Sequence, residues 1–394
     1  MGSSLLATKS RAKFAPSKEI TYLCPRNGGA TPAPPPESCK ERSMKQTELY
    51  PLLFRPNLHP VVWGGRGLKP WKGLPADAEP IGESWEVSVV PSAVSTIANG
   101  PLEGTPLDQL IAARPQEVLG QEVARRHGGE LPLLVKFIDA EQDLSIQVHP
   151  DDTMARREHG KLGKSEMWYV IDARPGAYLY AGFKETITPY EYRRRVEDGS
   201  ITDVLARHEV RRGDVFYLPA GRVHAICGGI RLAEVQQSSD VTYRIFDYNR
   251  PGMDGQPRQL HTELAAQALD YTVESEYRTQ YALRENGASL VLDTPHFTVR
   301  INEVYRPIHR DLVKYDSFII SMCLQGSCRI RLRTNGTEVA LSEGHTCLIP
   351  ASVADYDILP DESRGLCRIL DAFIDNKDRS LLRSVSRFLH LTKR

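Results

Sequence analysis

One twelve-residue pattern occurs twice in the chain and restricts the fold more than any other feature. Residues 213–224, GDVFYLPAGRVH, align without a gap with residues 344–355, GHTCLIPASVAD. Each copy has a turn glycine, a short run of strand-forming residues, and a proline that ends the run before another turn. Two copies of one β unit predict two jelly-roll barrels.

Alternating apolar residues predict strands along most of the chain after residue 44. The clearest segments are residues 84–90, 133–140, 144–150, 166–171, 213–226, 229–237 and 242–248, followed by a block of strands over 289–374. A helical piece is expected at 106–120, and a small helical insertion at about 188–210, where Thr188 is a suitable N-cap before Pro189. The predicted class is therefore all-β with a small helical insertion.

Composition divides the chain into three parts. Residues 1–43 are rich in proline and glycine and lack apolar periodicity, so we expect a disordered N-terminal extension. A metal-binding domain is predicted over residues 44–285 and a second, metal-free domain over 286–394, with a polar stretch near the boundary.

Charge and cysteine usage exclude several classes of protein. Lys+Arg and Asp+Glu both number 50, and no apolar run approaches the roughly 20 residues that span a bilayer. We therefore expect neither nucleic acid nor membrane as a partner.

The seven cysteines form no CxxC pair, which favours reduced thiols in the cytoplasm, with Cys323, Cys328 and Cys347 in the core. A monomer or a weak homodimer is expected.

A possible metal site follows from two strands and the repeated motif. In LSIQVHP, Gln147 and His149 share one face, and Glu166 begins the next predicted strand after a segment, 150–164, that we interpret as a loop. His224 lies just past a strand end and a tight turn. Two imidazoles and one carboxylate suit a divalent transition metal, with an amide oxygen as a weak fourth ligand.

The second copy of the motif lacks these ligands. Asp355 occupies the position of His224, and no histidine corresponds to His149. A metal is therefore predicted in the first barrel only.

Five motifs in order resemble type I phosphomannose isomerase of the short bacterial kind. They are VVWGG, QVHPDD, GKSEMWYVI, LPAGRVHAI and AEVQQSSDVTYRIFDYNR, within a resemblance that runs from about residue 50 to 374. The resemblance implies a zinc-dependent cupin with one Zn²⁺ per chain, which interconverts mannose 6-phosphate and fructose 6-phosphate. The residues that match the zinc ligands of the family are Gln147, His149, Glu166 and His224.

The same resemblance assigns three catalytic residues. Lys164 matches an active-site lysine, Arg244 matches the arginine regarded as catalytic, and Glu234 matches an acidic residue ten positions before it. Ser165 stands where longer members of the family have proline, which puts no role in doubt.

The residues themselves leave alternatives open. Lys164 could be a solvated loop lysine, and Glu234 could face solvent. Arg244, on a buried-looking strand, needs a partner, either a carboxylate such as Asp247 or the substrate. Arg250 is our candidate for binding phosphate. Histidines without ligand-like neighbours are expected at the surface, and they are His59, His127, His159 and His261.

For this isomerase, the expected reaction moves a proton between C2 and C1 through a cis-enediolate. Glu234 is the candidate base, and Lys164 and Arg244 would place positive charge beside the enediolate. Zinc could polarise the carbonyl or only position the sugar. Two other classes stay open, a cupin Fe(II) dioxygenase and a non-catalytic sugar-phosphate-binding cupin. We found no Walker A, Rossmann or nucleotidyltransferase pattern.

Overall fold

Four antiparallel sheets dominate this computed structural model, which describes residues 46–376. Sheet I has six strands, in the order β2 (Leu58–Gly65), β3 (Ile81–Val87), β4 (Leu133–Ala140), β11 (Ile230–Gln237), β6 (Glu166–Ala173) and β9 (Val215–Leu218). Sheet II has five strands, in the order β12 (Tyr243–Phe246), β5 (Ile146–Val148), β10 (His224–Ile226), β7 (Tyr178–Phe183) and β8 (Leu205–Glu209).

The other two sheets belong mainly to the C-terminal part of the chain. Sheet III has the order β1 (Leu52–Leu53), β19 (Thr346–Ile349), β16 (Ile319–Gln325), β21 (Cys367–Phe373), β14 (Thr298–Val304) and β13 (Gly287–Asp293). Sheet IV has the order β15 (Ile308–Asp311), β20 (Asp355–Pro360), β17 (Ser327–Leu332) and β18 (Glu338–Ser342). The predicted dominance of β structure is confirmed, but none of the four sheets closes into a barrel among the described residues.

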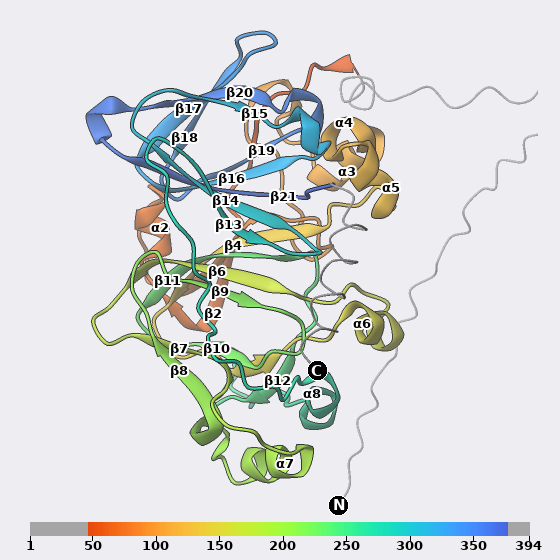
Figure 1. Cartoon of the computed structure of the whole chain (residues 1–394), viewed down its shortest axis with the longest axis vertical. Helices are drawn as coiled ribbons and strands as arrows, with labels where there is room; N and C mark the ends of the chain where they lie inside the picture. The colour runs from red at the N-terminus through yellow and green to blue at the C-terminus, as the bar shows by residue number, and fades with distance from the viewer. Residues whose placement is uncertain (1–45, 377–394) are drawn as a thin grey trace, which may run out of the picture. The chain divides into compact units, whose positions relative to one another are not determined.

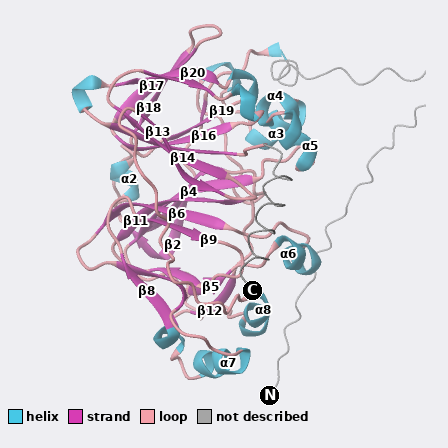
Figure 2. Ribbon diagram, in the orientation of Figure 1, coloured by secondary structure: helices cyan, strands magenta, loops and turns pink. Residues whose placement is uncertain are grey.

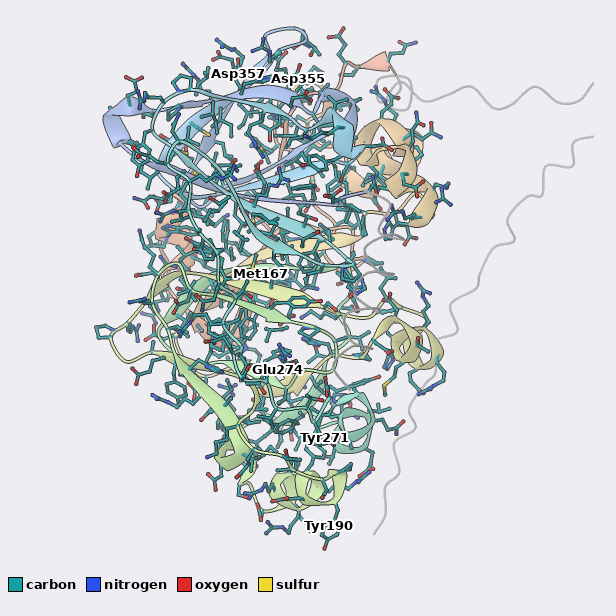
Figure 3. All side chains as sticks on the ribbon, viewed as in Figure 1. Met167, Tyr190, Tyr271, Glu274, Asp355 and Asp357 are labelled. Carbon is teal, nitrogen blue, oxygen red and sulfur yellow. The ribbon has the colours of Figure 1, made fainter. Side chains whose placement is uncertain are left out.

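The sheets lie in layers in the order IV, III, I, II, as Figures 1 and 2 show. Sheet I is consequently buried on both faces, which explains the nearly continuous apolar sequence of β4. Val135 and Phe137 join the core shared with sheet III, whereas Ile138 joins the core shared with sheet II. Met167, labelled in Figure 3, belongs to the core shared with sheet III.

Short helices surround these layers. The α-helices are α2 (Leu68–Trp71), α3 (Leu107–Ala113), α4 (Pro115–Leu119), α5 (Gln121–Arg126), α6 (Asp152–His159), α7 (Pro189–Glu197) and α8 (Thr262–Ala268). The 3-10 helices are η1 (Gly100–Leu102), η2 (Ile201–Val204), η3 (Val313–Tyr315), η4 (Ala351–Val353) and η5 (Glu362–Arg364). Apolar residues of α3, α4 and α5 join the core of sheet III, and those of α7 and α8 join the core of sheet II. No helix in residues 46–376 is long and apolar enough to cross a membrane.

One local prediction was wrong and another was confirmed only in part. The segment 150–164 contains helix α6, because Asp151 caps its start by accepting a hydrogen bond from Met154 N at 2.8 Å, and Gly160 ends it in the left-handed conformation. The predicted helical insertion at 188–210 begins with α7, where Thr188 is the N-cap, but it continues as η2 and then as strand β8.

Strand β1 connects the two ends of the described chain. It pairs with β19, so residues just after position 50 extend a sheet that the last strands build.

The domain boundary at 285/286 stays a prediction. The predicted extension over residues 1–43 and the expected start at Met44 lie outside the described residues.

Candidate metal centre and active site

Sheets I and II place the three predicted protein ligands at one point between them. His149 directly follows β5, His224 begins β10 opposite Gln147, and Glu166 begins β6 in the facing sheet. All three side chains are buried, and their ligand atoms lie within 4.8 Å of one another. No other group of this kind occurs in residues 46–376.

Helix α6 explains how His149 and Glu166 meet although 17 positions separate them. After the helix ends at Gly160, Lys164 N donates to Pro150 O at 3.1 Å, which closes the segment. Gly163 packs against the backbone of Asp151, where an added Cβ would approach to 2.5 Å. The segment therefore needs a glycine at this close approach to bring β6 back beside His149.

Backbone carbonyls set the orientation of both imidazoles. His149 Nδ1 donates to Val241 O at 2.9 Å, and His224 Nδ1 donates to Arg222 O at 2.8 Å. Because a carbonyl can only accept, each ring carries its proton on Nδ1 and keeps a lone pair on Nε2. The two Nε2 atoms lie 3.3 Å and 3.2 Å from the oxygens of Glu166.

Glu166 is a fully buried carboxylate that pairs with Lys164 and faces both imidazoles. Burial alone would raise its pKa, but Lys164, His149 and His224 together hold that pKa well below the usual value. Burial, followed by Lys164, lowers the pKa of His149 to about 3, and burial also lowers the pKa of His224. An ionised carboxylate between two neutral imidazoles fits a divalent transition metal.

Gln147 and Lys164 complete the immediate surroundings. The amide Nε2 of Gln147 lies 3.3 Å from His224 Nε2, and rotation of the amide would exchange its nitrogen and oxygen there. Lys164 Nζ lies 2.6 Å from Glu166 Oε2 and 3.1 Å from His149 Nε2. Lys164 is only 5% exposed, so the alternative of a solvated loop lysine is wrong.

A second row of polar side chains crosses the same face of sheet I. Glu234 on β11 is 3% exposed, so the alternative that it faces solvent is also wrong. Trp168 Nε1 donates to its Oε2 at 2.9 Å, and Lys136 Nζ lies 3.3 Å from its Oε1. Burial and then the charge of Glu166 raise the pKa of Glu234, while Lys136 opposes that rise.

Lys136 is a site residue that our sequence reasoning missed. It lies on β4 between Glu234 and Glu83, whose Oε2 is 3.4 Å from its Nζ. Burial would lower its pKa, but Glu83 and Glu234 outweigh burial and raise it. The sequence did contain a signal for this residue. Lys136 stands in the middle of the apolar run LLVKFIDA, and a lysine that is buried with such a strand must have buried partners.

Arg244 lies on β12 directly opposite Gln147. Its Nε donates to Ser145 Oγ at 3.3 Å and its Nη1 to Gln259 O at 3.1 Å. Burial and then the charge of Arg258 lower its pKa. No ion pair within residues 46–376 involves Arg244, and the expected structural partner Asp247 binds two other arginines instead.

The remaining predicted residues lie apart from the ligand set. Arg250, the candidate for phosphate, pairs with Asp247 at 3.0 Å. The ring of His59 contacts that of Trp85 at a tilt of 32°, with the centroids 4.6 Å apart, and His159 is exposed. His127 and His261 are half-buried. As expected, Cys323, Cys328 and Cys347 are buried thiols.

Comparisons with known proteins agree on one family. Residues 54–173 match the family described as "Phosphomannose isomerase type I, catalytic domain". The "Probable mannose-6-phosphate isomerase GmuF" of Bacillus subtilis is 34% identical over 324 residues, covering 82% of this chain and 98% of that relative. The mannose-6-phosphate isomerase of Streptococcus mutans is 33% identical over 308 residues, which are 78% of this chain and 94% of that protein.

A solved structure gives the same result. The crystal structure of the mannose 6-phosphate isomerase from Bacillus subtilis superposes with a TM-score of 0.73 at 30% identity. The superposition covers 82% of this chain and 99% of that protein.

Proposed function

The chain belongs to the type I phosphomannose isomerase family and is an isomerase, and we propose that it interconverts mannose 6-phosphate and fructose 6-phosphate through a cis-enediolate with one bound zinc ion. The observation that carries the zinc proposal is the buried carboxylate of Glu166, whose two oxygens face the Nε2 atoms of His149 and His224 at 3.3 Å and 3.2 Å. Zinc accepts such nitrogen and oxygen ligands.

His149, Glu166 and His224 would hold the metal, with the amide oxygen of Gln147 as the fourth ligand. Zinc bound there would supply positive charge that stabilises a developing oxyanion and would help to fix the opened sugar. The carbonyls of Val241 and Arg222 keep the two imidazoles oriented for this task.

Glu234 is the proposed general base. As a carboxylate it would take the proton from C2 of the open-chain aldose, so that the C2–H electron pair forms the C1–C2 double bond and the C1=O π pair moves onto O1. A proton would pass from O2 to O1, and protonation of C1 by Glu234 would then form the carbonyl group at C2. The raised pKa of Glu234 makes the carboxylate a stronger base than an exposed one. Lys136 and Trp168 hold it in place through its two oxygens.

Positive side chains would stabilise the enediolate. Lys164 and Lys136 place two buried ammonium groups near the ligand set, and Arg244 lies on the neighbouring strand with no carboxylate partner in the part of the chain that the structure describes. Fixed positive charge in a buried site stabilises negative charge as it develops, because no reorganisation of water is required.

The pairing of the sheets supports the proposal of two jelly-roll halves, residues 44–285 and 286–394. The first copy of the repeated motif runs from β9 in sheet I to β10 in sheet II, and the second runs from β19 in sheet III to β20 in sheet IV. Asp355, which Figure 3 labels, lies on sheet IV at the position of His224. It pairs with His309 at 2.7 Å. We accordingly propose that only the first half binds metal.

Location and assembly remain proposals as well. The five cysteines within residues 46–376 are free thiols, which supports the expected cytoplasmic location. A small sugar phosphate is the proposed partner, and a monomer or a weak homodimer stays a prediction.

A coupled assay tests the proposed reaction directly. The purified chain with zinc should convert mannose 6-phosphate to fructose 6-phosphate, and a chelator should abolish that turnover reversibly. Oxygen consumption with Fe(II) would instead identify a dioxygenase, and binding of mannose 6-phosphate without turnover would identify a non-catalytic protein. Either result would overturn the proposal.

Lys136→Met should lower turnover by about 10²- to 10³-fold, because a preorganised charge beside the reacting atoms is lost. Removal of the ammonium should also raise the pKa of Glu234 further, so the acidic limb of the pH–rate profile should move to higher pH. Lys314→Met, at an exposed lysine, is the matched control. An unchanged rate and profile would refute a role for Lys136.

A further inference from the structure

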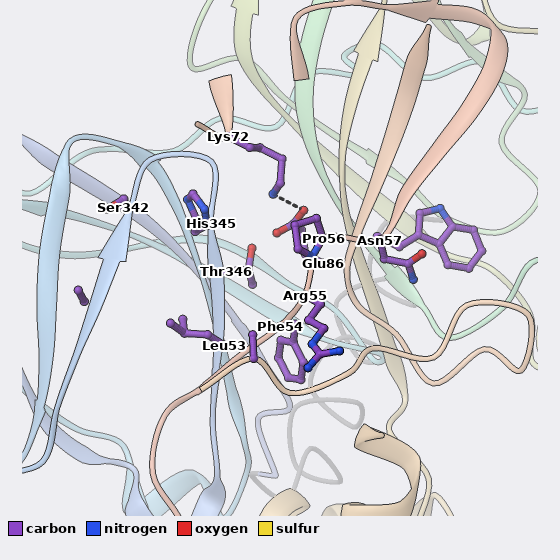
Figure 4. Close-up of a pocket in the computed structure, with 13 residues that line it drawn as sticks. Leu53, Phe54, Arg55, Pro56, Asn57, Lys72, Glu86, Ser342, His345 and Thr346 are labelled. Carbon is purple, nitrogen blue, oxygen red and sulfur yellow. Dashed lines mark hydrogen bonds and ion pairs between the residues drawn. The ribbon is translucent and has the colours of Figure 1, made fainter. Parts of the chain in front are cut away.

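A cavity of about 320 Å³ lies beside β3, where the turn between β18 and β19 approaches it (Figure 4). It contains none of the residues that we assign to the metal or to catalysis. The residues that line it are Leu53, Phe54, Arg55, Pro56, Asn57, Lys72, Trp85, Glu86, Ala98, Ala340, Ser342, His345 and Thr346. Its volume is at the lower end of the range for small-molecule sites.

A buried ion pair forms part of the wall. Lys72 Nζ lies 2.7 Å from Glu86 Oε1, and the two side chains are 3% and 7% exposed. Ser84 Oγ donates to the same oxygen, and Lys72 also donates to Gly344 O. The ion pair therefore links β3 to the turn between β18 and β19.

The pair keeps unused hydrogen-bonding capacity beside the cavity. Glu86 Oε2 accepts no hydrogen bond from any residue within 46–376, and Lys72 has used two of its three N–H groups. A nearly buried ion pair with unused capacity can therefore bind a polar group that enters the cavity. Thr346 Oγ1, across the cavity in Figure 4, is buried and has no hydrogen-bond partner within residues 46–376.

These groups select a class of ligand. A hydroxyl group donates one hydrogen bond and accepts others, so neighbouring hydroxyls match a carboxylate oxygen next to an ammonium. Lys72 neutralises Glu86, which leaves Arg55 as the formal charge at the cavity. Arg55 is 58% exposed, and its contact with Glu103 at 3.7 Å is a weak surface pair. The ligand should therefore be an anion with several hydroxyl groups.

We propose that this cavity is a second binding site for a small polyhydroxylated anion, the class that includes sugar phosphates and sugar acids. The site is separate from the metal centre and does not depend on the proposed reaction. Strand β3 connects the two regions, because Trp85 and Glu86 both line the cavity while the ring of Trp85 also contacts Lys136 at 4.8 Å. Glu83 on the same strand pairs with Lys136 as well.

Calorimetric titration of the metal-loaded full chain can count the sites. The probe is D-glucitol 6-phosphate, which has no carbonyl group and cannot isomerise, and gluconate is the second probe for the carboxylate form of the class. Wild-type protein should bind two molecules of glucitol 6-phosphate or of gluconate per chain. Glu86→Gln should weaken the second site by about 10- to 100-fold, because a charged hydrogen-bond acceptor is lost.

Ser342→Trp fills the exposed mouth of the cavity and leaves the ion pair intact, so it tests the site even if Glu86→Gln folds poorly. It should leave one site, and combining it with His149→Ala should leave none. Ser92→Trp, at an exposed turn outside the cavity, is the matched control and should keep two sites.

The number of binding sites that each variant keeps tests the proposal. A wild-type stoichiometry of one that His149→Ala removes and Ser342→Trp keeps would overturn it, because the cavity would then hold only water. Two sites that neither Glu86→Gln nor Ser342→Trp changes would also overturn it. A single site that Ser342→Trp removes and His149→Ala keeps would support the cavity and count against the metal centre as the substrate site.

Discussion

Replacing His149 with alanine should remove the metal and abolish turnover in the same preparation. His149 contributes one of two imidazole nitrogens at a site with only three charged or imidazole ligands, and its loss leaves Glu166 and His224 to hold the ion. Loss of even an outer hydrogen-bonding partner of a metal ligand weakens binding by about 10- to 100-fold. Loss of the ligand itself should exceed that range.

Elemental analysis and the coupled assay on the same sample provide the measurement. His127→Ala is the matched control, since His127 is half-buried and outside the ligand set, and it should keep both metal and rate. Full turnover by protein that has been stripped of metal would disprove the metal-dependent mechanism. Zinc found at Asp355 instead would show that the metal binds in the half formed by residues 286–394.

Arg244→Ala should lower the turnover number by about 10²- to 10³-fold while the metal content stays full. Arg244 pairs with Gln147 across β12 and β5 and has no carboxylate partner within residues 46–376, so its charge would be available to the oxygens of the proposed enediolate. Arg244→Lys should restore only part of the rate, because an ammonium cannot reproduce the planar donor geometry. Kinetics, metal content and melting temperature are measured on one preparation.

Arg258→Ala provides the contrast for a purely structural arginine. Arg258 donates two hydrogen bonds to Asp247, so its removal should lower the melting temperature and leave the rate per folded molecule near that of the parent. If Arg244→Ala behaves in the same way, Arg244 is structural and our assignment fails.

Local sequence patterns were sufficient to predict many of the strands and the set of candidate metal ligands. Strand β4 has the predicted bounds, 133–140, because its composition reflects burial on both faces. The strand expected at 166–171 is β6, which extends to residue 173. Alternation likewise placed Gln147 and His149 on one face, and the structure brings both beside Glu166 and His224.

Other features depended on contacts between distant segments. Helix α6 was missed because its apolar pattern is short and its polar residues resemble those of a loop, although Asp151 caps it. Lys136 was overlooked because nothing near it in the sequence indicates that Glu83 and Glu234 lie on the two neighbouring strands. Arg250, our candidate for binding phosphate, pairs with Asp247, which the sequence did not indicate.

Periodicity and motifs of a few neighbouring residues were enough to predict the predominance of β structure, the repeated β unit and the residue types at the candidate metal centre. Which polar side chains are buried together could be learned only from the packing of the sheets. Lys164 and Glu234 both had a solvated alternative in sequence, and each is at most 5% exposed once sheet II covers sheet I. Burial of a side chain, and hence its pKa and its chemistry, depends on which sheets face each other, and strands far apart in sequence build those sheets.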